Sequence, residues 1–170
     1  LARGLGSNSN IKKITQTIRQ NVKKKIDLIS INDKFMATNG GLGLAADVAR
    51  EINELRSLFP QFKNLMKFSG KSIYSLFLAK KLLNLEIKKF KFKVSSLEYN
   101  DIFYSSLILI NNQPALGGDF IVAPNTTHQD GTFNVTIFKH RNRLELIRCI
   151  LRILHGDYPV NDKNLLSYET

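Results

Sequence analysis

The segment from Asn111 to Val135 separates two apolar runs and limits the folds that are open to this chain. Pro124 has no backbone N–H to donate to a strand ladder, so it belongs at a strand end. Asp130 and Gly131 form a strong turn pair. The apolar run Leu107–Ile110 precedes these residues and the alternating run Phe133–Phe138 follows them. The pattern therefore predicts a strand, a long loop and a second strand.

The length and composition predict one globular domain. A chain of 170 residues is long enough to bury a core. The hydrophobic content of 43% and the mean hydropathy of -0.15 are typical of a soluble, folded chain. No apolar run reaches the roughly 18 residues of a membrane span, and the N-terminus is not a signal peptide. The single cysteine, Cys149, excludes an internal disulfide and fits a reducing cytoplasm.

The net charge of +11 restricts the choice of partners. Lysines cluster at residues 23–25 and 88–89 and continue at Lys91 and Lys93. A basic surface suits nucleic acid, anionic lipid head groups or a phosphorylated substrate. A solvated face on a lysine-rich protein accounts for the same charge equally well.

Apolar residues at helical spacing predict helices at residues 9–21, 45–58, about 69–85, and between an Asn142 cap and Gly156. Pro60 is expected to stop the second helix, and Phe62–Met66 to form a separate short turn. The two middle helices are apolar and basic, which suits a lipid cleft or a membrane surface as well as an ordinary core-facing hairpin.

The last helix has a predicted buried stripe and a predicted exposed face. Arg148 and Arg152 are expected outside, and Cys149 is expected to pack beside the stripe instead of acting as a nucleophile. The residues expected to be buried are Leu144, Ile147, Ile150, Leu151 and Leu154.

Strands are predicted at 26–31, 34–38, 89–95, 102–110 and 133–138, and residues 161–170 resemble the start of another. In the third of these, Phe90 and Phe92 alternate with lysines and are expected to point inward. A strand without an exposed aromatic platform argues against a binder of single-stranded nucleic acid. The lysines on its other face protect an edge strand as readily as they bind phosphate.

Gly41, Gly43 and Ala46 match the spacing of a dinucleotide-binding fingerprint. That site also requires an acidic residue at a strand end about 20 residues further on. The segment found there, Phe62–Lys67, is basic and helix-like. We therefore interpret the glycines as a structural turn that lets the chain enter a helix.

The order of motifs resembles the diacylglycerol kinase-like lipid kinases, a family that includes bacterial diacylglycerol and phosphatidylglycerol kinases and the sphingosine and ceramide kinases. Asp119 departs from the family's third glycine, and Gln129 from its usual Asp or Asn. The matching residues are Asn111, Gly117-Gly118-Asp119, Ala123-Pro124, Asp130-Gly131 and Phe133-Asn134-Val135.

The resemblance implies an α+β fold: an antiparallel β-sandwich-like domain with about four helices. Residues 1–170 would be the second domain of such a kinase, with the N-terminal nucleotide-binding domain and the C-terminal end outside this chain. The family's phosphate-binding loop Gly-Gly-Asp-Gly-Thr and its Asp-Gly-Glu base motif do not occur, since Asp130-Gly131 is followed by Thr132. No catalytic residue and no nucleotide-binding residue is therefore assigned.

The implied function is the acceptor side of an ATP-dependent lipid kinase that phosphorylates a diacylglycerol-like hydroxyl. Asn111, Gly117, Gly118 and Asp119 would form the substrate-cleft loop. ATP would bind mainly to the other domain. The resemblance also implies an Mg²⁺ ion held by the side chain of Asp130 and the main-chain carbonyls of Thr127 and Thr132, although Asp130 shapes the turn without a metal equally well.

The expected partners are a membrane lipid substrate and the anionic inner face of a membrane, with no nucleic acid, and a homodimer is left open. Two other functions compete. A non-catalytic lipid-binding or membrane-binding module needs no catalytic motifs. A relative of the nicotinamide-cofactor kinases shares the two-domain plan, but the order of the Gly117–Asp130 loop disfavours it.

Overall fold

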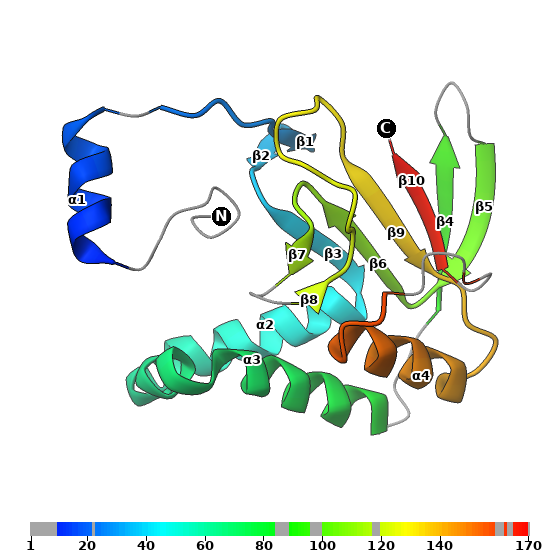
Figure 1. Cartoon of the computed structure of the whole chain (residues 1–170). Coiled ribbons are helices and arrows are strands. Elements are labelled where there is room, and N and C mark those ends of the chain that lie inside the picture. The colour runs from blue at the N-terminus through cyan, green and yellow to red at the C-terminus, as the bar shows by residue number, and fades with distance from the viewer. Residues whose placement is uncertain are drawn as a thin grey trace.

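A four-stranded antiparallel sheet forms the centre of the fold (Figure 1). The computed structural model describes residues 10–21, 23–83, 89–95, 100–116, 120–158, 162 and 165–169. The strand order is β10-β9-β6-β3. The strands are β3 (Asn39–Gly43), β6 (Leu107–Asn111), β9 (Asn134–Phe138) and β10 (Leu165–Glu169).

Three helices cover one face of this sheet, below it in Figure 1. They are α2 (Leu44–Leu58), α3 (Pro60–Leu83) and α4 (Arg143–Leu154). Leu107 and Leu109 of β6 pack in one core cluster with Val48 and Ile52 of α2 and Ile150 of α4. Side chains alternate between the faces of a strand, so odd-numbered residues of β6 point to the helices.

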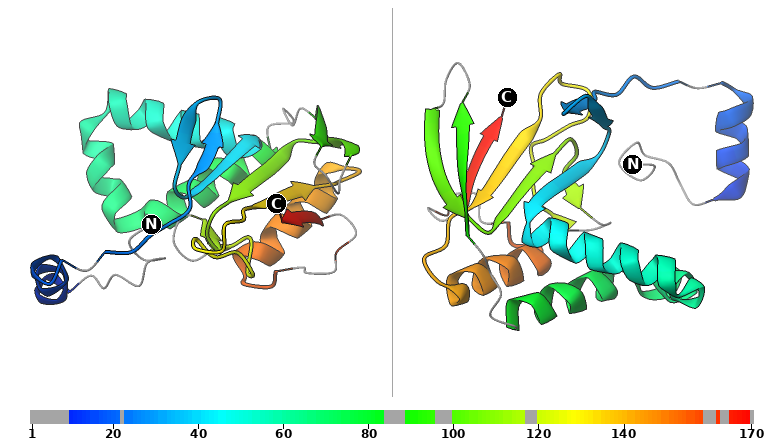
Figure 2. Two further views of the ribbon diagram at one scale, coloured as in Figure 1. Left: turned by 90° about the horizontal axis from the view of Figure 1, so that it is seen from above. Right: turned by 180° about the vertical axis from the view of Figure 1, so that it is seen from behind.

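A two-stranded ribbon packs on the opposite face. It consists of β4 (Phe90–Ser95) and β5 (Asn100–Ser105), and Figure 2 shows it beside β10. Phe92 and Phe103, which are register partners, contact a cluster formed by Ile108, Ile137 and Tyr168. The sheet is thus enclosed by helices on one side and strands on the other, which confirms the predicted α+β, sandwich-like fold.

Smaller elements lie at the edges of this core. The β1 (Ile29–Ile31) and β2 (Lys34–Met36) hairpin turns through Asn32 and Asp33, both with positive φ, as a two-residue hairpin requires. A second hairpin pairs β7 (Ala115–Leu116) with β8 (Phe120–Ile121). The helix α1 (Ile11–Arg19), capped by the side chain of Asn10, lies apart from the rest in both figures.

Two predicted helix boundaries were wrong around residues 60–69. The predicted stop at Pro60 is confirmed, because α2 ends at Leu58, but Pro60 is also the first residue of α3, a position where its missing N–H has no helical partner anyway. The predicted short turn and the helix from Ser69 are one continuous helix, Pro60–Leu83. Lys81 of α3 lies 3.3 Å from Glu51 of α2, an ion pair that links the two helices.

The strand predicted at 102–110 is in fact two strands in two different sheets, separated at Ser106. The hydroxyl of Ser105 causes the break: it lies 2.8 Å from the carbonyl of Leu107 and accepts a hydrogen bond from the Leu107 N–H at 3.1 Å. A side chain that bonds its neighbour's backbone in this way replaces the ladder. The strand predicted at 26–31 is shorter and begins at Ile29, and the one at 34–38 ends at Met36.

The glycine-rich segment was predicted as a turn, but Asn39–Gly43 forms strand β3. Gly43 then connects β3 directly to α2 with a φ of +67°. A Cβ at Gly43 would collide with the carbonyl oxygen of Ser106, which accepts the N–H of Leu44 at 2.8 Å. This geometry supports the structural interpretation of the glycines, because they serve close packing of β3 on β6.

Both ends of α4 are capped as predicted. The side chain of Asn142 accepts the N–H of Glu145 at 3.0 Å, and Glu145 in turn accepts the N–H of Arg141 at 2.7 Å. Gly156, with a φ of +86°, ends the helix in a Schellman-type turn in which the Asp157 N–H donates to the Arg152 carbonyl.

The buried stripe of α4 is rotated from the predicted one. Leu144 and Leu151 are exposed, and of the predicted set only Ile150 is fully buried. The buried residues are Leu146, Cys149, Ile150 and Ile153. Packing of Cys149 in the core confirms its predicted structural role, and burial raises the pKa of its thiol to about 11.

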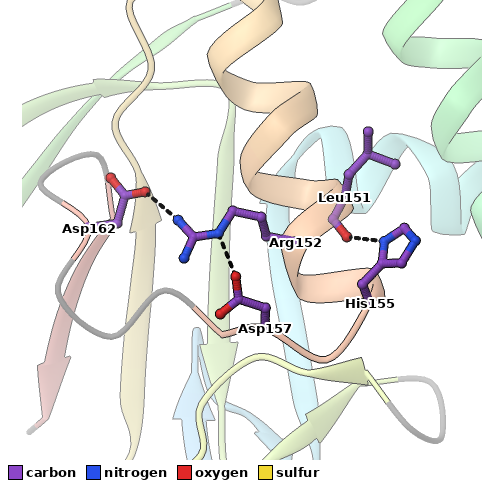
Figure 3. A network of polar contacts seen from close by, with 5 residues as sticks. All are labelled: Leu151, Arg152, His155, Asp157 and Asp162. Atoms are coloured by element: carbon purple, nitrogen blue, oxygen red, sulfur yellow. Dashed lines mark hydrogen bonds and ion pairs between the residues drawn. The ribbon is translucent and has the colours of Figure 1, made fainter.

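The exposed face of α4 orients the chain that leads to β10. Figure 3 shows Arg152 between two carboxylates, with its Nε 2.8 Å from Asp157 and its Nη1 3.4 Å from Asp162. Hydrogen bonding to Arg152 holds the pKa of Asp157 below its usual value. At the helix end, Nδ1 of His155 lies 2.8 Å from the carbonyl of Leu151.

Candidate functional site

A row of amide side chains crosses one end of the central sheet. Asn39, Asn111 and Asn134 are register partners on β3, β6 and β9, and Asn134 is paired in turn with Glu169 of β10. Asn111 is fully buried, and its amide nitrogen donates to the hydroxyl of Thr136 at 3.2 Å. The row marks the end at which the loops of the site leave the sheet.

Asn39 holds the loop that follows β6. Its side-chain Oδ1 accepts the N–H groups of Asn112 at 3.1 Å and Gln113 at 3.2 Å, and its Nδ2 donates to the carbonyl of Ala115 at 2.9 Å. Asn112, also fully buried, donates to the carbonyls of Asp27 and Ala37. These bonds fix the start of the predicted substrate-cleft loop.

Only one of the four residues predicted to form that loop, Asn111, is among the described ones. Gly117, Gly118 and Asp119 lie outside the described residues. Asn111 lies inside the sheet, and its side-chain Oδ1 is buried without a hydrogen-bond partner in the part of the chain that the structure describes. The role of these four residues in a substrate cleft stays a prediction.

The turn at Asp130 brings together the three residues of the predicted Mg²⁺ site. One carboxylate oxygen of Asp130 accepts the N–H of Thr127 at 3.1 Å and its hydroxyl at 2.8 Å. The other accepts the N–H and the hydroxyl of Thr132, both at 3.0 Å. Asp130 is exposed, and the slight loss of solvent around its carboxylate raises its pKa, but these hydrogen bonds outweigh that effect and lower the pKa to about 2.

The N–H and hydroxyl groups of Thr127 and Thr132 compete with a metal ion for the Asp130 carboxylate. Oxygen ligands suit Mg²⁺, yet both oxygens of the Asp130 carboxylate are already engaged by the turn itself. No group of three or more His, Cys, Asp or Glu side chains suited to a metal ion occurs among the described residues. That finding does not test a site made of one carboxylate and two carbonyls, so the Mg²⁺ site stays a prediction.

An apolar cavity of about 390 Å³ lies between the helix face of the sheet and the helices. Strand β6 contributes Leu107 and Leu109, and α4 contributes Ile150 and Ile153. One wall is made of small residues from β3, α2 and α3, namely Gly40, Gly41, Ala45, Ala49 and Ser75. The cavity exists because these side chains do not reach across the gap to their neighbours. Such a volume and an apolar lining are typical of small-molecule sites.

The sequence analysis missed this cavity. The signal was present as small residues at the end of β3 and on one face of α2, but nothing in the sequence shows that they meet Leu109 or Ile153. Gly41 illustrates the close approach, since a Cβ there would lie 2.7 Å from Cβ of Ala45. Asn39, the register partner of Asn111, is among the residues that line the cavity.

A buried His–Ser pair, also missed, lies next to the break between β5 and β6. Nε2 of His140 is 3.1 Å from the hydroxyl of Ser106, and Nδ1 is 3.1 Å from the carbonyl of Phe138. A carbonyl only accepts, so Nδ1 carries the proton and Nε2 accepts from Ser106. Lys89 donates to the carbonyl of His140 at 2.8 Å. Burial is the main reason that the pKa of His140 is lowered.

Residues 41–165 match the family model described as the YegS C-terminal NAD kinase beta sandwich-like domain. The chain belongs to this family. The predicted resemblance to the diacylglycerol kinase-like enzymes is thereby confirmed. The match covers β6, β9, the three helices that face the sheet, most of the cavity lining and the Asp130 turn, whereas Asn39, Gly40 and all of β10 after Leu165 lie outside it.

Named relatives agree with this assignment. Diacylglycerol kinase of Bacillus subtilis (strain 168) is 23% identical over 170 residues, which cover 97% of this chain and 51% of that protein. A Staphylococcus carnosus (strain TM300) protein, named provisionally as a lipid kinase, is 25% identical over 130 residues, covering 76% of this chain and 39% of the relative. The chain thus spans about half or less of the curated relatives that it matches.

The fold also matches solved structures. A crystal structure from Bacillus anthracis str. Sterne, described provisionally as a diacylglycerol kinase, superposes with a TM-score of 0.66 at 17% identity. The superposition covers 99% of this chain and 50% of that one. At this identity the match shows the shared fold alone.

Proposed function

We propose that this domain forms the acceptor side of an ATP-dependent lipid kinase that phosphorylates the hydroxyl of a diacylglycerol-like lipid. Three observations support the proposal. The chain belongs to the YegS C-terminal family. The relatives named above are called diacylglycerol or lipid kinases. The domain contains an apolar cavity of about 390 Å³, and this cavity is the observation that carries the proposal.

The lining of the cavity favours an apolar ligand. Leu78, Leu107, Leu109 and Ile153 surround it, and Asn39 and Ser75 are its only polar lining residues among the described ones. A nucleotide or sugar placed there would lose hydrogen bonds to water without replacement, whereas a hydrocarbon tail would gain burial. This argues against the rival nicotinamide-cofactor kinase, whose substrate is polar.

In the proposed function, the cavity contributes by positioning. A tail held between β6 and α4 fixes the distance of the lipid hydroxyl from the cavity, and such fixed geometry lowers the barrier to transfer. ATP, bound mainly by a nucleotide-binding domain outside this chain, supplies the phosphoryl group. The acids and base that assist transfer are also expected outside this chain.

A cavity-filling substitution tests the proposal. Ala49→Phe should occupy the cavity and weaken binding of dioctanoylglycerol at least tenfold, measured by calorimetry on residues 1–170. Ala79→Phe makes the same change at an exposed position of α3 and should leave binding unchanged. Equal binding by the two variants would remove the cavity from the proposal.

Activity separates the proposal from the binding-module alternative. The full-length gene product should transfer phosphate from ATP to diacylglycerol, and Ala49→Phe should raise the KM for the lipid. A product that binds diacylglycerol but transfers no phosphate would be a non-catalytic module. Binding of NAD⁺ in preference to diacylglycerol would instead support the nicotinamide-cofactor kinase.

We further propose that the protein is cytoplasmic and works at the anionic inner face of a membrane. None of the helices in the described part of the chain has the length and apolar character needed to cross a bilayer. The junction of α2 and α3 instead exposes Leu58 and Phe59 next to Arg56, a combination suited to an interface with anionic head groups.

Vesicle sedimentation tests this membrane contact. Phe59→Glu should reduce binding to vesicles that contain phosphatidylglycerol, whereas Phe35→Glu should not, although Phe35, on the β1–β2 hairpin, is the more exposed of the two phenylalanines. Binding that ignores the phosphatidylglycerol content would count against an anionic membrane partner. Nucleic acid is not an expected partner. The prediction that Phe90 points inward was nevertheless wrong, because Phe90 is 44% exposed. Phe92 does pack against the cluster on the ribbon face, as predicted.

A further inference from the structure

The outer surface of the helix layer carries two short rows of exposed leucines. On α3 they are Leu76 and Leu83, which are 67% and 71% exposed, and on α4 they are Leu144 and Leu151, which are 63% and 47% exposed. The two leucines of each row are seven positions apart, so they lie two turns apart on nearly the same side of their helix. These side chains therefore form two ordered leucine rows.

The two leucine rows belong to neighbouring helices. Nη1 of Arg143, the first residue of α4, donates at 3.4 Å to the carbonyl of Leu83, the last residue of α3. Both helices line the same cavity, and Figure 1 shows them in one layer beneath the sheet. Leu78 of α3 and Ile150 of α4 line that cavity, whereas the leucine rows are turned to solvent. The two rows therefore lie on one outer surface, away from the cavity.

The spacing within the rows indicates the shape of a partner. A repeat of seven residues is the pattern that one helix presents to another in coiled-coil packing. An amphipathic helix that docks on such a surface uses anchors at i, i+3 or i+4, and i+7, which match rows of this kind. Four leucines offer far less area than the roughly 800 Å² per partner of a standard protein interface. The surface therefore fits a single helix better than the face of a whole domain.

The charge of the two helices indicates an acidic partner. Helix α3 contains five lysines and no Asp or Glu, and α4 contains three arginines against a single Glu. Lys80 and Arg148 each follow a leucine of the rows by four residues, so both border the rows. Lys80 shares its charge with Glu51 of α2, whereas Arg148 has no ion pair among the described residues. Carboxylates on the flanks of a bound helix would complement these cations.

The same charges argue against other occupants. Helix α1 is amphipathic, but it contains Lys12, Lys13 and Arg19 and no acidic residue, so neither this helix nor α1 of a second copy complements the surface. Two copies that met through their leucine rows would bring the cations at the borders together, which is unfavourable. Surfaces that insert into a bilayer usually include aromatic residues, and the rows consist of leucine alone.

We propose that α3 and α4 together bind an acidic amphipathic helix of another protein. Its apolar residues would pack along the two leucine rows, and its carboxylates would face Arg148 and Lys80. The rows lie on the opposite side of the helices from the cavity, so this binding does not depend on the proposed lipid-kinase activity.

A synthetic peptide tests the proposal on the full-length gene product. The fluorescently labelled probe has three heptads with leucine at the first and fourth positions, and glutamate or alanine elsewhere. In fluorescence anisotropy it should bind with a micromolar Kd, as expected for a small interface. A control peptide with lysine in place of every glutamate should bind at least tenfold more weakly. Equal binding of the two peptides, or no binding of the glutamate peptide, would overturn the proposal.

A matched set of variants locates the surface. Leu83→Gln and Leu144→Gln, one in each row, should each weaken binding of the glutamate peptide at least fivefold. Leu58→Gln, at a leucine of α2 that is 70% exposed, should leave this binding unchanged. All three side chains are exposed, so these changes do not disturb the core.

Two further measurements on the row variants separate the other occupants. If Leu83→Gln and Leu144→Gln abolish self-association or binding to phosphatidylglycerol vesicles but leave peptide binding unchanged, the occupant is a second copy or a membrane and the proposal fails. Phosphate transfer is not the readout, so failure of the proposed kinase function would not alter the result.

Discussion

The two faces of the central sheet are packed differently. On the ribbon face, Phe103, Ile108, Ile137 and Tyr168 form a cluster with large side chains from every layer. On the helix face, the same strands leave a cavity of about 390 Å³ because β3 and α2 present small residues there. One sheet therefore carries a filled core on one face and an apolar cavity, the proposed lipid site, on the other.

We expect this difference to separate stability from the proposed lipid binding within one fold. A cavity costs stability because its lining loses contacts that a filled core would make. The ribbon face has no such cost, because its buried side chains contact one another and the partly buried residues packed against them. We therefore expect substitutions on the ribbon face to act on stability, and substitutions around the cavity to act first on ligand binding.

The largest expected effect is that of Ile137→Ala. Ile137 is completely buried on the ribbon face, so its truncation should lower the free energy of unfolding by about 3–5 kcal/mol. Ile153→Ala, on the cavity wall, should cost only about 2–3 kcal/mol because one side of Ile153 already faces the cavity. Urea denaturation measures both values, and equal losses would contradict the contrast between the faces.

The next effect concerns the junction where β3 passes into α2 beneath the cavity. Gly43→Ala should cost about 2–3 kcal/mol, because it combines a φ of +67° with a collision against the Ser106 carbonyl. Gly156→Ala has a φ of +86° but meets nothing within 4 Å, so it isolates the strain alone, about 1 kcal/mol. Thermal unfolding compares them, and a smaller loss at Gly43 would contradict the collision.

A pH-dependent effect is expected at His140, which lies beside the break between the two faces. Burial lowers the pKa of His140 in the folded state, and nearby Lys89 adds to this while Glu145 opposes it. The unfolded state, with a pKa near 6.5, therefore takes up the proton first as the pH falls. Stability should decline by up to about 1.4 kcal/mol per pH unit below pH ~6.5.

Denaturation curves at pH 7.5, 6.5 and 5.5 measure this dependence. His140→Gln should be less stable than the parent at pH 7.5, because the bonds to Ser106 and Phe138 are altered. The difference should shrink toward pH 5.5, since the variant has no proton to take up. A constant difference over this range would exclude His140 as the titrating group.

The smallest expected effect is that of Asp130→Asn, outside both faces. The pKa of Asp130 is lowered to about 2, so its contribution is present above pH ~4 and is lost as the pH falls toward 2. Because the side chain is exposed, we expect a loss below about 1 kcal/mol at pH 7.

The same variant tests the predicted metal site. If Thr127, Asp130 and Thr132 hold Mg²⁺, millimolar Mg²⁺ should raise the Tm of the parent but not that of Asp130→Asn. Calcium chloride at the same ionic strength controls for screening and for selectivity. If the Tm of both proteins does not depend on Mg²⁺, the predicted metal site is wrong and the Asp130 carboxylate only stabilises the turn.

Much of the fold was predictable because local patterns dominate it. The alternation of Phe90 to Val94, the caps at Asn142 and Gly156, and the run Leu107–Ile110 all act over a few residues. The buried stripe of α4 was not predictable, because Leu and Ile occur on most sides of that helix. Tertiary packing alone buries Leu146 and Ile153 and leaves Leu144 and Leu151 exposed.

The candidate site was predictable only in its turns. The pair Asp130 and Gly131 indicates a turn in any sequence. In the structure the hydroxyls of Thr127 and Thr132 donate to the Asp130 carboxylate. The cavity depends on residues far apart in the chain, such as Ala49 and Ile153, whose meeting no local pattern records. The hydrogen bond between His140 and Ser106 was not predictable either, because Ser106 lies in a run whose pattern predicts one uninterrupted strand.

The pairing of β3 with β6 has a consequence for how the domain forms. Every residue of β3 pairs with a residue of β6 more than sixty positions later in the chain, whereas α2 and α3 are adjacent in sequence. Closing so long a loop is slow compared with forming a local helical hairpin. We therefore expect the floor of the cavity to assemble late, so that newly made chains bind a tail only once the whole sheet is closed.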